Sequence, residues 1–295
     1  MYTTRFFNYL EFEMRCSVHT LKAYQNDLGQ LGTFLQKNYP ETDMLLADHF
    51  MIRSWIVSML EEQTEPSTMH RKISSLRSFY RYFIREGLLL KNPMSKVLLP
   101  AVSKRLPAVI EEQKMNFLLD EEIFSSGFRG LRDHLVIEVL YATGMRLAEL
   151  IGVTDADIDL VQHQVKVMGK RRKQRIIPFQ PLLSETIAGY ITERNNHFDV
   201  RSPGNSLLVT DKNEPLYPRL VYRIVHEALG RVTTQDKRSP HILRHSYATS
   251  LLDRGADLNA IKELLGHANL AATQIYTHNS ISRLKKVYDQ AHPKA

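Results

Sequence analysis

A proline-rich segment divides this chain of 295 residues into two parts and limits the folds that it can adopt. The prolines of this segment are Pro93, Pro100 and Pro107. Because proline removes a helical hydrogen bond and clashes with the preceding turn, no regular helix continues through it. Apolar residues recur at helical spacing on both sides. We therefore predict two domains, residues 1–92 and 108–295, joined by a linker over 93–107.

The first part has the pattern of an all-helical domain. Ser17 suits the N-cap of a helix that carries Leu21, Leu28 and Phe34 on one side. Gly87 suits the end of a later helix. Helices are expected near residues 6–12, 17–34, 50–60 and 67–87.

The second part combines helices with one small sheet. Helical periodicity recurs over residues 111–119, 131–141, 182–192, 218–229, 241–252, 259–265 and 281–290. Strand-like stretches cover residues 158–160, 164–168 and 175–179, and a basic turn joins the last two. The predicted fold class is mainly α with a small antiparallel sheet.

Composition narrows the classes of partner. The chain has 39 Lys and Arg against 32 Asp and Glu, a formal net charge of +7, which favours a polyanionic partner without establishing one. No apolar run reaches the length of about 18 residues that a membrane-spanning helix needs, so we expect no membrane partner. The amino terminus lacks the apolar stretch of a signal peptide, and the single cysteine, Cys16, allows no internal disulfide. These features predict a cytoplasmic protein.

Two groups of basic side chains are candidates for nucleic-acid contact. The first lies mainly along one helical face and consists of Arg71, Lys72, Arg77, Arg81 and Arg85. The second fills the turn of the predicted hairpin and consists of Lys170, Arg171, Arg172, Lys173 and Arg175. A solvated basic face is the alternative for the first group, and an ordinary polar turn for the second. Because charges as dense as those in the hairpin repel one another, an anionic ligand would stabilise them. We predict that both groups contact DNA.

Other polar side chains occur where helices begin. Arg146 follows a glycine break, where a guanidinium and free backbone N–H groups suit a phosphate. His241 and Arg244, three residues apart, lie on one face of a predicted helix. His241 and His245 have the spacing of half a zinc site, but no HExxH glutamate or cysteine completes the ligand set. We therefore expect no metal.

These weak signals become specific when they are taken together. Their order along the chain is Arg146, Lys170, His241, Arg244, His267 and Tyr276. In this order they resemble the signature of the tyrosine recombinases. The stretches LRHSYATSLLDRGADL, LLGHANLAATQIYTH and RLKKVYDQAHPKA are particularly similar to bacterial Xer-type recombinases. The resemblance covers essentially the whole chain and implies a helical, SAM-like core-binding domain followed by a mixed α/β catalytic domain.

The resemblance also implies the reaction. Tyr276 would attack a DNA phosphorus atom and give a 3′-phosphotyrosyl intermediate with a free 5′-hydroxyl. Arg146 and Arg244 would clamp the phosphoryl oxygens, and His241 and His267 would add hydrogen bonds. Because the covalent ester conserves the energy of the broken phosphodiester bond, religation would need no ATP. The cations would stabilise the negative charge that a metal ion stabilises in other enzymes. We expect no cofactor.

A lysine on the hairpin is expected to protonate the leaving 5′-hydroxyl. Lys170 is the first choice for this general acid. The hairpin reads Gly-Lys-Arg where the family commonly has Gly-Lys-Gly, so Lys173 remains the alternative. Glu149, three residues after Arg146, is expected to orient that arginine or a histidine.

The resemblance implies a double-stranded DNA recombination site as the partner. It also implies a cyclic tetramer on two such sites, in which residues 281–290 pack against a neighbouring protomer. The protein would act alone or with a second related recombinase, under the control of a septal DNA translocase. Its expected role is the resolution of chromosome dimers at cell division, and so chromosome partition.

Three alternatives to the Xer type remain open. A phage or transposon integrase uses the same chemistry for DNA integration, but often carries an additional amino-terminal arm-binding domain. Helical signals begin within about ten residues of Met1, which leaves no room for such a domain before them. A type IB topoisomerase would use similar residues to relax supercoils. A non-catalytic site-specific DNA-binding protein would not need Tyr276.

Overall fold

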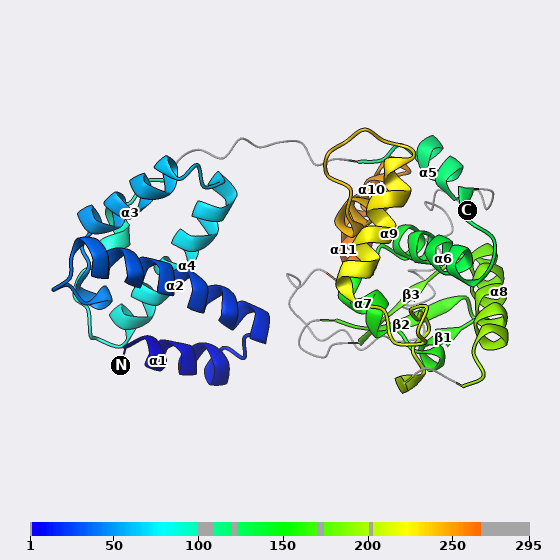
Figure 1. Ribbon diagram of the computed structural model, residues 1–295, viewed down its shortest axis with the longest axis horizontal. Helices are drawn as coiled ribbons and strands as arrows, with labels where there is room; N and C mark the ends of the chain where they lie inside the picture. Colours follow the sequence, from blue (N-terminus) through cyan, green and yellow to red (C-terminus); the bar gives the residue numbers. More distant parts are fainter. Residues whose placement is uncertain (1, 100–108, 120–122, 170–173, 201–202, 267–295) are drawn as a thin grey trace. The chain divides into compact units, whose positions relative to one another are not determined.

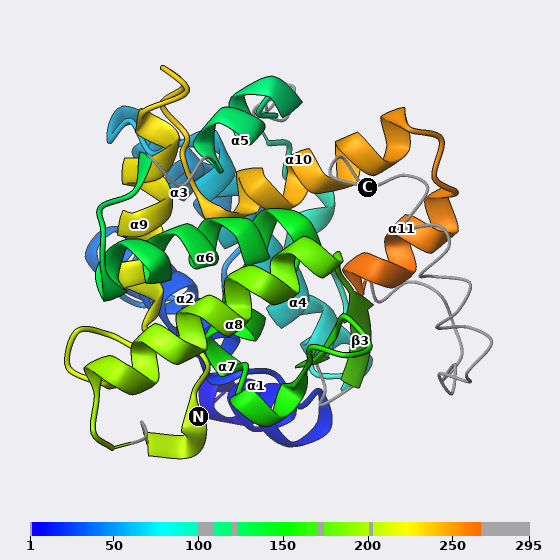
Figure 2. The same cartoon turned by 90° about the vertical axis from the view of Figure 1, so that its right-hand side faces the viewer.

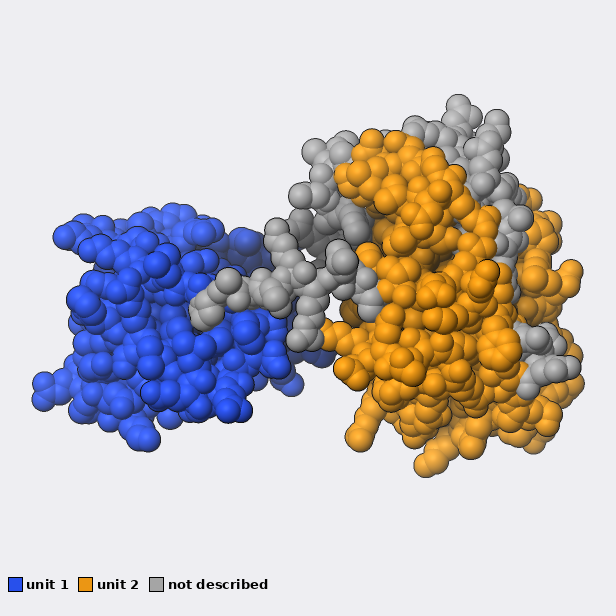
Figure 3. Space-filling view, turned by 90° about the horizontal axis from the view of Figure 1, so that it is seen from above, with its two compact units in different colours: residues 1–105 blue, residues 106–295 orange. Residues whose placement is uncertain are grey.

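The computed structural model describes residues 2–99, 109–119, 123–169, 174–200 and 203–266. The chain divides into two compact units, unit 1 from Met1 to Arg105 and unit 2 from Leu106 to Ala295 (Figure 3). Helices predominate, and the described strands form one antiparallel sheet. The predicted fold class, mainly α with a small antiparallel sheet, is confirmed. Within the described ranges, no helix is both long and apolar enough to cross a membrane.

The described part of unit 1 is built from helices (Figure 1). They are α1 (Tyr2–Asn8), α2 (Val18–Asn38), α3 (His49–Glu61) and α4 (Pro66–Arg85), with short π or 3₁₀ turns at Tyr9–Glu13, Met44–Leu46 and Pro93–Lys96. The predicted cap of α2 is in place, because the Ser17 hydroxyl oxygen accepts the backbone N–H of Thr20 at 3.2 Å. The single amino-terminal helix predicted near residues 6–12 is instead α1 followed by a π-helical turn.

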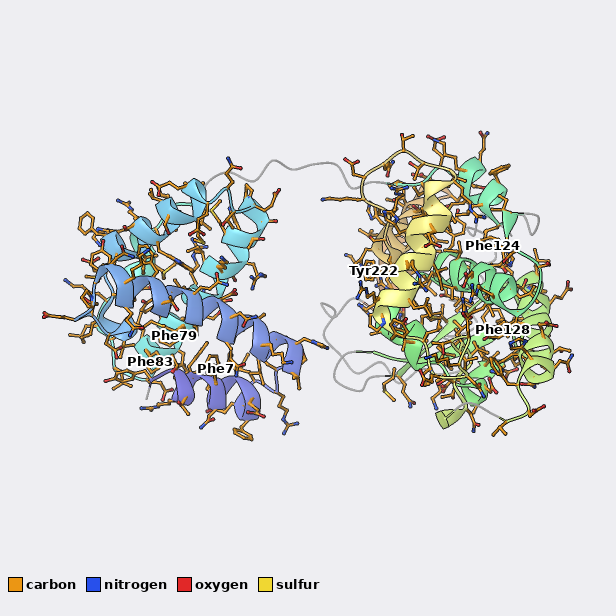
Figure 4. All side chains as sticks on the ribbon, viewed as in Figure 1. Phe7, Phe79, Phe83, Phe124, Phe128 and Tyr222 are labelled. Carbon is orange, nitrogen blue, oxygen red and sulfur yellow. The ribbon has the colours of Figure 1, made fainter. Side chains whose placement is uncertain are left out.

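The core of unit 1 is rich in aromatic side chains. Phe6 of α1 meets Phe79 of α4 edge to face, with ring centroids 5.3 Å apart. Phe79 in turn lies 4.9 Å from Phe83, one turn further along α4 (Figure 4). Each such pair stabilises the fold by about 0.5–1.5 kcal/mol beyond the contribution of the apolar area that it buries. These contacts fix one face of α4 in the core, so its exposed arginines lie on the remaining surface of the helix.

Unit 2 is organised around one central helix. The helices of its described part are α5 (Glu112–Leu118), α6 (Phe128–Thr143), α7 (Leu147–Gly152), α8 (Pro181–His197), α9 (Pro218–Gly230), α10 (Pro240–Asp253) and α11 (Leu258–Leu265), with 3₁₀ turns at Asp155–Asp157 and Pro203–Asn205. Helix α6 is buried along nearly its whole length and contacts α7, α8, α9 and α10 (Figure 2). A helix buried all round belongs at the centre of its domain.

The sheet lies within unit 2. Its strands are β1 (Ile158–Asp159), β2 (Gln164–Met168) and β3 (Gln174–Pro178), in the order β1-β2-β3. Across the β2–β3 pair, Val165 is opposite Ile177 and Val167 is opposite Arg175. All four side chains are buried, so this face of the hairpin points into the unit. The register therefore places a charged residue, Arg175, on the inner face of the sheet.

Helices α10 and α11 pack on each other through a small core of their own. Its members include Tyr247 and Leu251 of α10 and Ile261 and Leu264 of α11. Helix α11 ends at Gly266, whose backbone is left-handed with a φ of +63°. Figure 2 shows this end of α11 beside β3. The contacts made there form the candidate site.

Candidate active site

Arg146 follows a sharp turn at the end of α6. Gly144 has a left-handed backbone with a φ of +58°, and a Cβ there would lie 2.3 Å from Cδ1 of the buried Tyr247 ring. Only glycine fits such a position without strain. The chain then turns and places Arg146 at the N-cap of α7. The glycine break that marked Arg146 in the sequence is thus the structural reason for its position.

Glu149 is the centre of the site, with a side chain only 3% exposed. Its carboxylate accepts the backbone N–H of Arg146 at 2.6 Å and Nη1 of Arg146 at 2.8 Å. It also accepts a bidentate pair from Arg175, with Nη1 at 2.6 Å and Nη2 at 2.8 Å. Burial raises the pKa of the Glu149 carboxyl, but the hydrogen bonds from Arg175 and Arg146 outweigh it and lower the pKa to about 2. Glu149 is therefore ionised at neutral pH.

Arg244 reaches the same place from α10. It is buried, and it donates from Nη1 to the Gly144 carbonyl at 2.5 Å and from Nη2 to the Leu265 carbonyl at 2.6 Å. Burial, followed by the positive charges of Arg146 and Arg175, lowers the pKa of Arg244 to about 10. The guanidinium therefore remains charged at neutral pH, beside two other cations.

The carboxyl end of α11 holds these arginines together. Three successive carbonyls each accept a hydrogen bond from a different arginine: Leu264 from Arg175 at 3.0 Å, Leu265 from Arg244 at 2.6 Å and Gly266 from Arg146 at 2.8 Å. Carbonyls in the last turn of a helix have no partner within the helix and carry partial negative charge. The arginines satisfy them and join α7, β3, α10 and α11 at one point.

We refer to Arg146, Glu149, Arg175 and Arg244 as the arginine cluster. It has three guanidinium groups and one carboxylate, a net charge of two positive units. Glu149 pairs with both Arg146 and Arg175, whereas Arg244 donates only to carbonyl oxygens among the described residues. The Arg146 side chain is 28% exposed, so a ligand can reach it. A preorganised excess of cations suits the charge that develops on a reacting phosphodiester. No set of three or more His, Cys, Asp or Glu side chains able to hold a metal ion occurs in the described ranges.

Comparison with known proteins identifies the family. Residues 109–283 match the phage integrase family, and residues 3–87 match the phage integrase N-terminal SAM-like domain. The sequence is 35% identical to the tyrosine recombinase XerC of Chlorobaculum tepidum, over 98% of this chain and 94% of that protein. The chain belongs to the phage integrase family.

Two further proteins are similar to this chain over most of its length. It is 36% identical to the tyrosine recombinase XerC of Mycobacterium sp. (strain JLS), over 98% of each chain. Its fold is similar to that of the XerH site-specific recombinase in a post-cleavage complex with palindromic difH, with a TM-score of 0.71 and 21% identity over 92% of this chain and 80% of that one. The protein is a tyrosine-type site-specific recombinase of the Xer type, and this prediction from the sequence is confirmed.

The structure places only some of the recombinase's predicted site residues. Arg146, Glu149 and Arg244 come together in the arginine cluster, although almost a hundred residues separate the first from the last. His241 is exposed on the first turn of α10. The remaining predicted residues lie outside the described ranges: Lys170, Arg171, Arg172, Lys173, His267 and Tyr276.

Arg175 has a different position from the predicted one. It was expected to contact DNA from the hairpin, but it is 5% exposed, and its guanidinium is engaged by Glu149 and the Leu264 carbonyl. All three guanidinium nitrogens of Arg175 already have an acceptor within the protein, and one of its partners is a carboxylate, so the DNA-contact prediction is corrected. The strand pattern held a usable signal, because Arg175, Ile177 and Phe179 alternate along one face.

In α4, Lys72 requires a similar correction. Lys72 is 8% exposed, and its Nζ lies 5.9 Å from the centroid of the Trp55 ring. It therefore packs inside unit 1 rather than on a surface that DNA could touch. Arg71 is half-exposed, but its Nη1 donates to the fully buried Asp27 carboxylate at 2.6 Å. Its guanidinium is already partnered within the recombinase.

The other arginines of α4 are more accessible. The Arg85 guanidinium lies 4.5 Å from the centroid of the Tyr9 ring and donates to the Tyr9 hydroxyl at 3.1 Å. Arg77 and Arg81 are exposed, and neither makes an ion pair within the described part of the chain. The predicted DNA-binding role is therefore strongest for Arg77 and Arg81.

Proposed function

We propose that this recombinase cuts and rejoins double-stranded DNA at a specific recombination site through a 3′-phosphotyrosyl intermediate on Tyr276. The observation that carries the proposal is the excess positive charge of the arginine cluster, supported by the family's recombinase activity. A phosphodiester gains negative charge on its non-bridging oxygens as it reacts, and preorganised cations in a dry site stabilise that charge. Three guanidinium groups that share one carboxylate leave the excess of positive charge that this requirement asks for.

The proposed cleavage step is a substitution at phosphorus. The Tyr276 oxygen forms a bond to phosphorus while the bond to the 5′-oxygen breaks, with Arg146, Arg244 and His241 bound to the phosphoryl oxygens. A free tyrosine ionises only near pH 10, so nearby cations and a histidine that accepts its proton are needed to activate it. His241 and His267 are the candidates for this proton acceptor, and His267 would also add a hydrogen bond to the phosphoryl oxygens.

The leaving 5′-oxygen needs a proton, and we propose Lys170 as its donor, with Lys173 as the alternative. The free 5′-hydroxyl of a second DNA strand then attacks the phosphotyrosyl ester, which restores a phosphodiester and releases Tyr276. Bond energy is conserved between the two steps, so this sequence requires no ATP. Glu149 keeps Arg146 in place throughout, because it accepts from both its backbone and its guanidinium.

We further propose that residues 1–92 form the DNA-gripping domain and that residues 108–295 form the catalytic domain. The exposed Arg77 and Arg81 would bind backbone phosphates. The similarity to Xer recombinases supports chromosome dimer resolution at cell division as the cellular role. We propose a tetramer on two DNA sites as the active assembly. A second related recombinase and a septal DNA translocase are candidate partners in that role, and the cytoplasm is the compartment in which it would occur.

A nicked suicide duplex in EDTA tests the proposed nucleophile. The duplex would carry a site that the protein itself selects from fragments of its host genome. Wild type and the control Tyr288→Phe should form a covalent protein–DNA adduct, and Tyr276→Phe should form none. An adduct that survives Tyr276→Phe would refute the nucleophile assignment. Binding of the selected site without any wild-type adduct would favour a protein that only recognises DNA.

A second substrate separates the two candidate general acids. A 5′-bridging phosphorothiolate leaves as a thiolate, which needs no proton. Lys170→Ala should therefore be inactive on ordinary DNA and active on this substrate. Rescue of Lys173→Ala instead would move the role to Lys173.

A further inference from the structure

We propose that Arg175 is a positioning residue of the recombinase, which fixes Glu149, and through it Arg146, against the end of α11. The proposal rests on the proposed function, in which Arg146 binds the reacting phosphate. Arg175 itself is not expected to touch DNA, because its side chain is 5% exposed. Its effect on the reaction would be transmitted through the carboxylate that it shares with Arg146.

The geometry of Arg175 supports this role. Its Nη1 and Nη2 atoms take both oxygens of Glu149, and its Nε donates to the Leu264 carbonyl at 3.0 Å. The planar guanidinium thus connects the first turn of α7 with the last turn of α11. A Cβ on Gly266 would lie 3.1 Å from Nη1 of Arg175, so the end of α11 packs directly on this side chain. Only arginine offers three donors in one plane.

Arg175 lies on a strand of the sheet and not in a loop. It lies on β3 opposite Val167, in a strand pair that is hydrogen-bonded along its length. Arg146 holds Glu149 from the partly exposed side of the cluster, and Arg175 holds it from the buried side. Sites built on strands and helices keep their geometry better than sites on loops. Without Arg175, Glu149 would keep only its contacts with Arg146, and its position would no longer be fixed by the sheet.

The charge state of Glu149 also depends on Arg175. The charged groups that face this carboxylate from the described elements are Arg146 at the start of α7, Arg175 of β3 and Arg244 of α10. Loss of Arg175 removes a hydrogen-bonding partner and a charge that lower the pKa of Glu149, whereas the effect of burial remains. The carboxyl would then take up a proton at higher pH and release Arg146. This predicts a pH effect that a merely structural residue would not produce.

The test compares Arg175→Gln and Arg175→Lys with Lys166→Gln, which removes an exposed cation from the neighbouring strand β2. Single-turnover cleavage of the suicide duplex is measured at a temperature where far-UV circular dichroism shows every variant folded. We expect Arg175→Gln to lose about 100-fold in cleavage rate, a loss typical of a misplaced reacting group. Arg175→Lys should fall between it and wild type, and Lys166→Gln should match wild type. The dissociation constant for DNA should change less than about threefold in all three variants because none of them removes a phosphate contact.

Two further readouts separate positioning from a general loss of structure. The pKa of the Glu149 carboxyl, followed by the ¹³C chemical shift of labelled glutamate, should be higher in Arg175→Gln than in wild type and unchanged in Lys166→Gln. If Arg175 acts through Glu149, the double variant with Glu149→Gln should cost about as much as the worse single variant rather than the product of the two losses. Additive losses, or a Glu149 pKa that is the same in Arg175→Gln and wild type, would overturn the proposal. Absence of any wild-type adduct would instead refute the proposed function.

Discussion

The substitution Glu149→Gln should strongly destabilise unit 2. The change from an ordinary pKa of 4.5 to about 2 corresponds to about 3 kcal/mol of stabilisation of the folded state by the ionised carboxylate. Because the pKa is lower in the folded state, this stabilisation is fully present above about pH 5 and is lost as the pH falls toward 2. Glutamine removes the charge but keeps the size of the side chain. It also leaves the buried Arg175 without its carboxylate, a change that is costly in protein interiors.

Thermal unfolding followed by far-UV circular dichroism measures the effect. For a unit of this size, about 3 kcal/mol corresponds to a fall in Tm of about 6–12 °C at pH 7. The difference in unfolding free energy between wild type and Glu149→Gln should shrink to about 1 kcal/mol at pH 3, because the wild-type carboxyl then loses its advantage. Trp55, the chain's only tryptophan, lies in unit 1 and provides an internal control. A difference that stays constant between pH 7 and pH 3 would refute the reasoning.

Three further predictions concern other residues. Asp27→Ala removes a fully buried acceptor of two hydrogen bonds from α4 and should lower the stability of unit 1 by about 1–3 kcal/mol; an unchanged midpoint in urea unfolding, followed by Trp55 fluorescence, would contradict this. Arg81→Gln should reduce the slope of log affinity for DNA against log salt concentration by about one, and Lys72→Met should leave it unchanged because Lys72 is buried; equal slopes for these two variants would argue against the phosphate contact. Gly144→Ala forces a left-handed residue to carry a Cβ that would lie 2.3 Å from a buried ring, and should lower the Tm of unit 2; a wild-type melting curve would show that the turn adapts.

Much of the fold could be predicted from local patterns. The β2 strand was predicted over its observed residues, Gln164–Met168, and α9 and α10 were predicted to within a residue or two at each end. Apolar periodicity and helix caps are local signals, so they appear directly in the sequence. The amino-terminal helix was less well predicted, because nothing local marks the π-helical turn that follows α1.

The sequence predicted several residues of the site but not the hydrogen bonds that join them. Gly144 and the following arginine could be recognised from sequence, whereas the three hydrogen bonds from arginines to the end of α11 join segments far apart in the chain. Arg175 was assigned to DNA because it follows a run of cations. The strand alternation with Ile177 placed it in the core instead, and burial of the partner carboxylate Glu149 makes that position favourable. Charge density alone therefore misassigned it, and the strand's alternation was the better guide.

The site of covalent attachment tests the central claim most directly. Wild-type protein would be trapped on the nicked duplex in EDTA, digested with nuclease and trypsin, and analysed by mass spectrometry. The nucleotide remnant should be found on the tryptic peptide of residues 263–283, at Tyr276. Attachment at Tyr288 or at any residue outside this peptide would contradict the account.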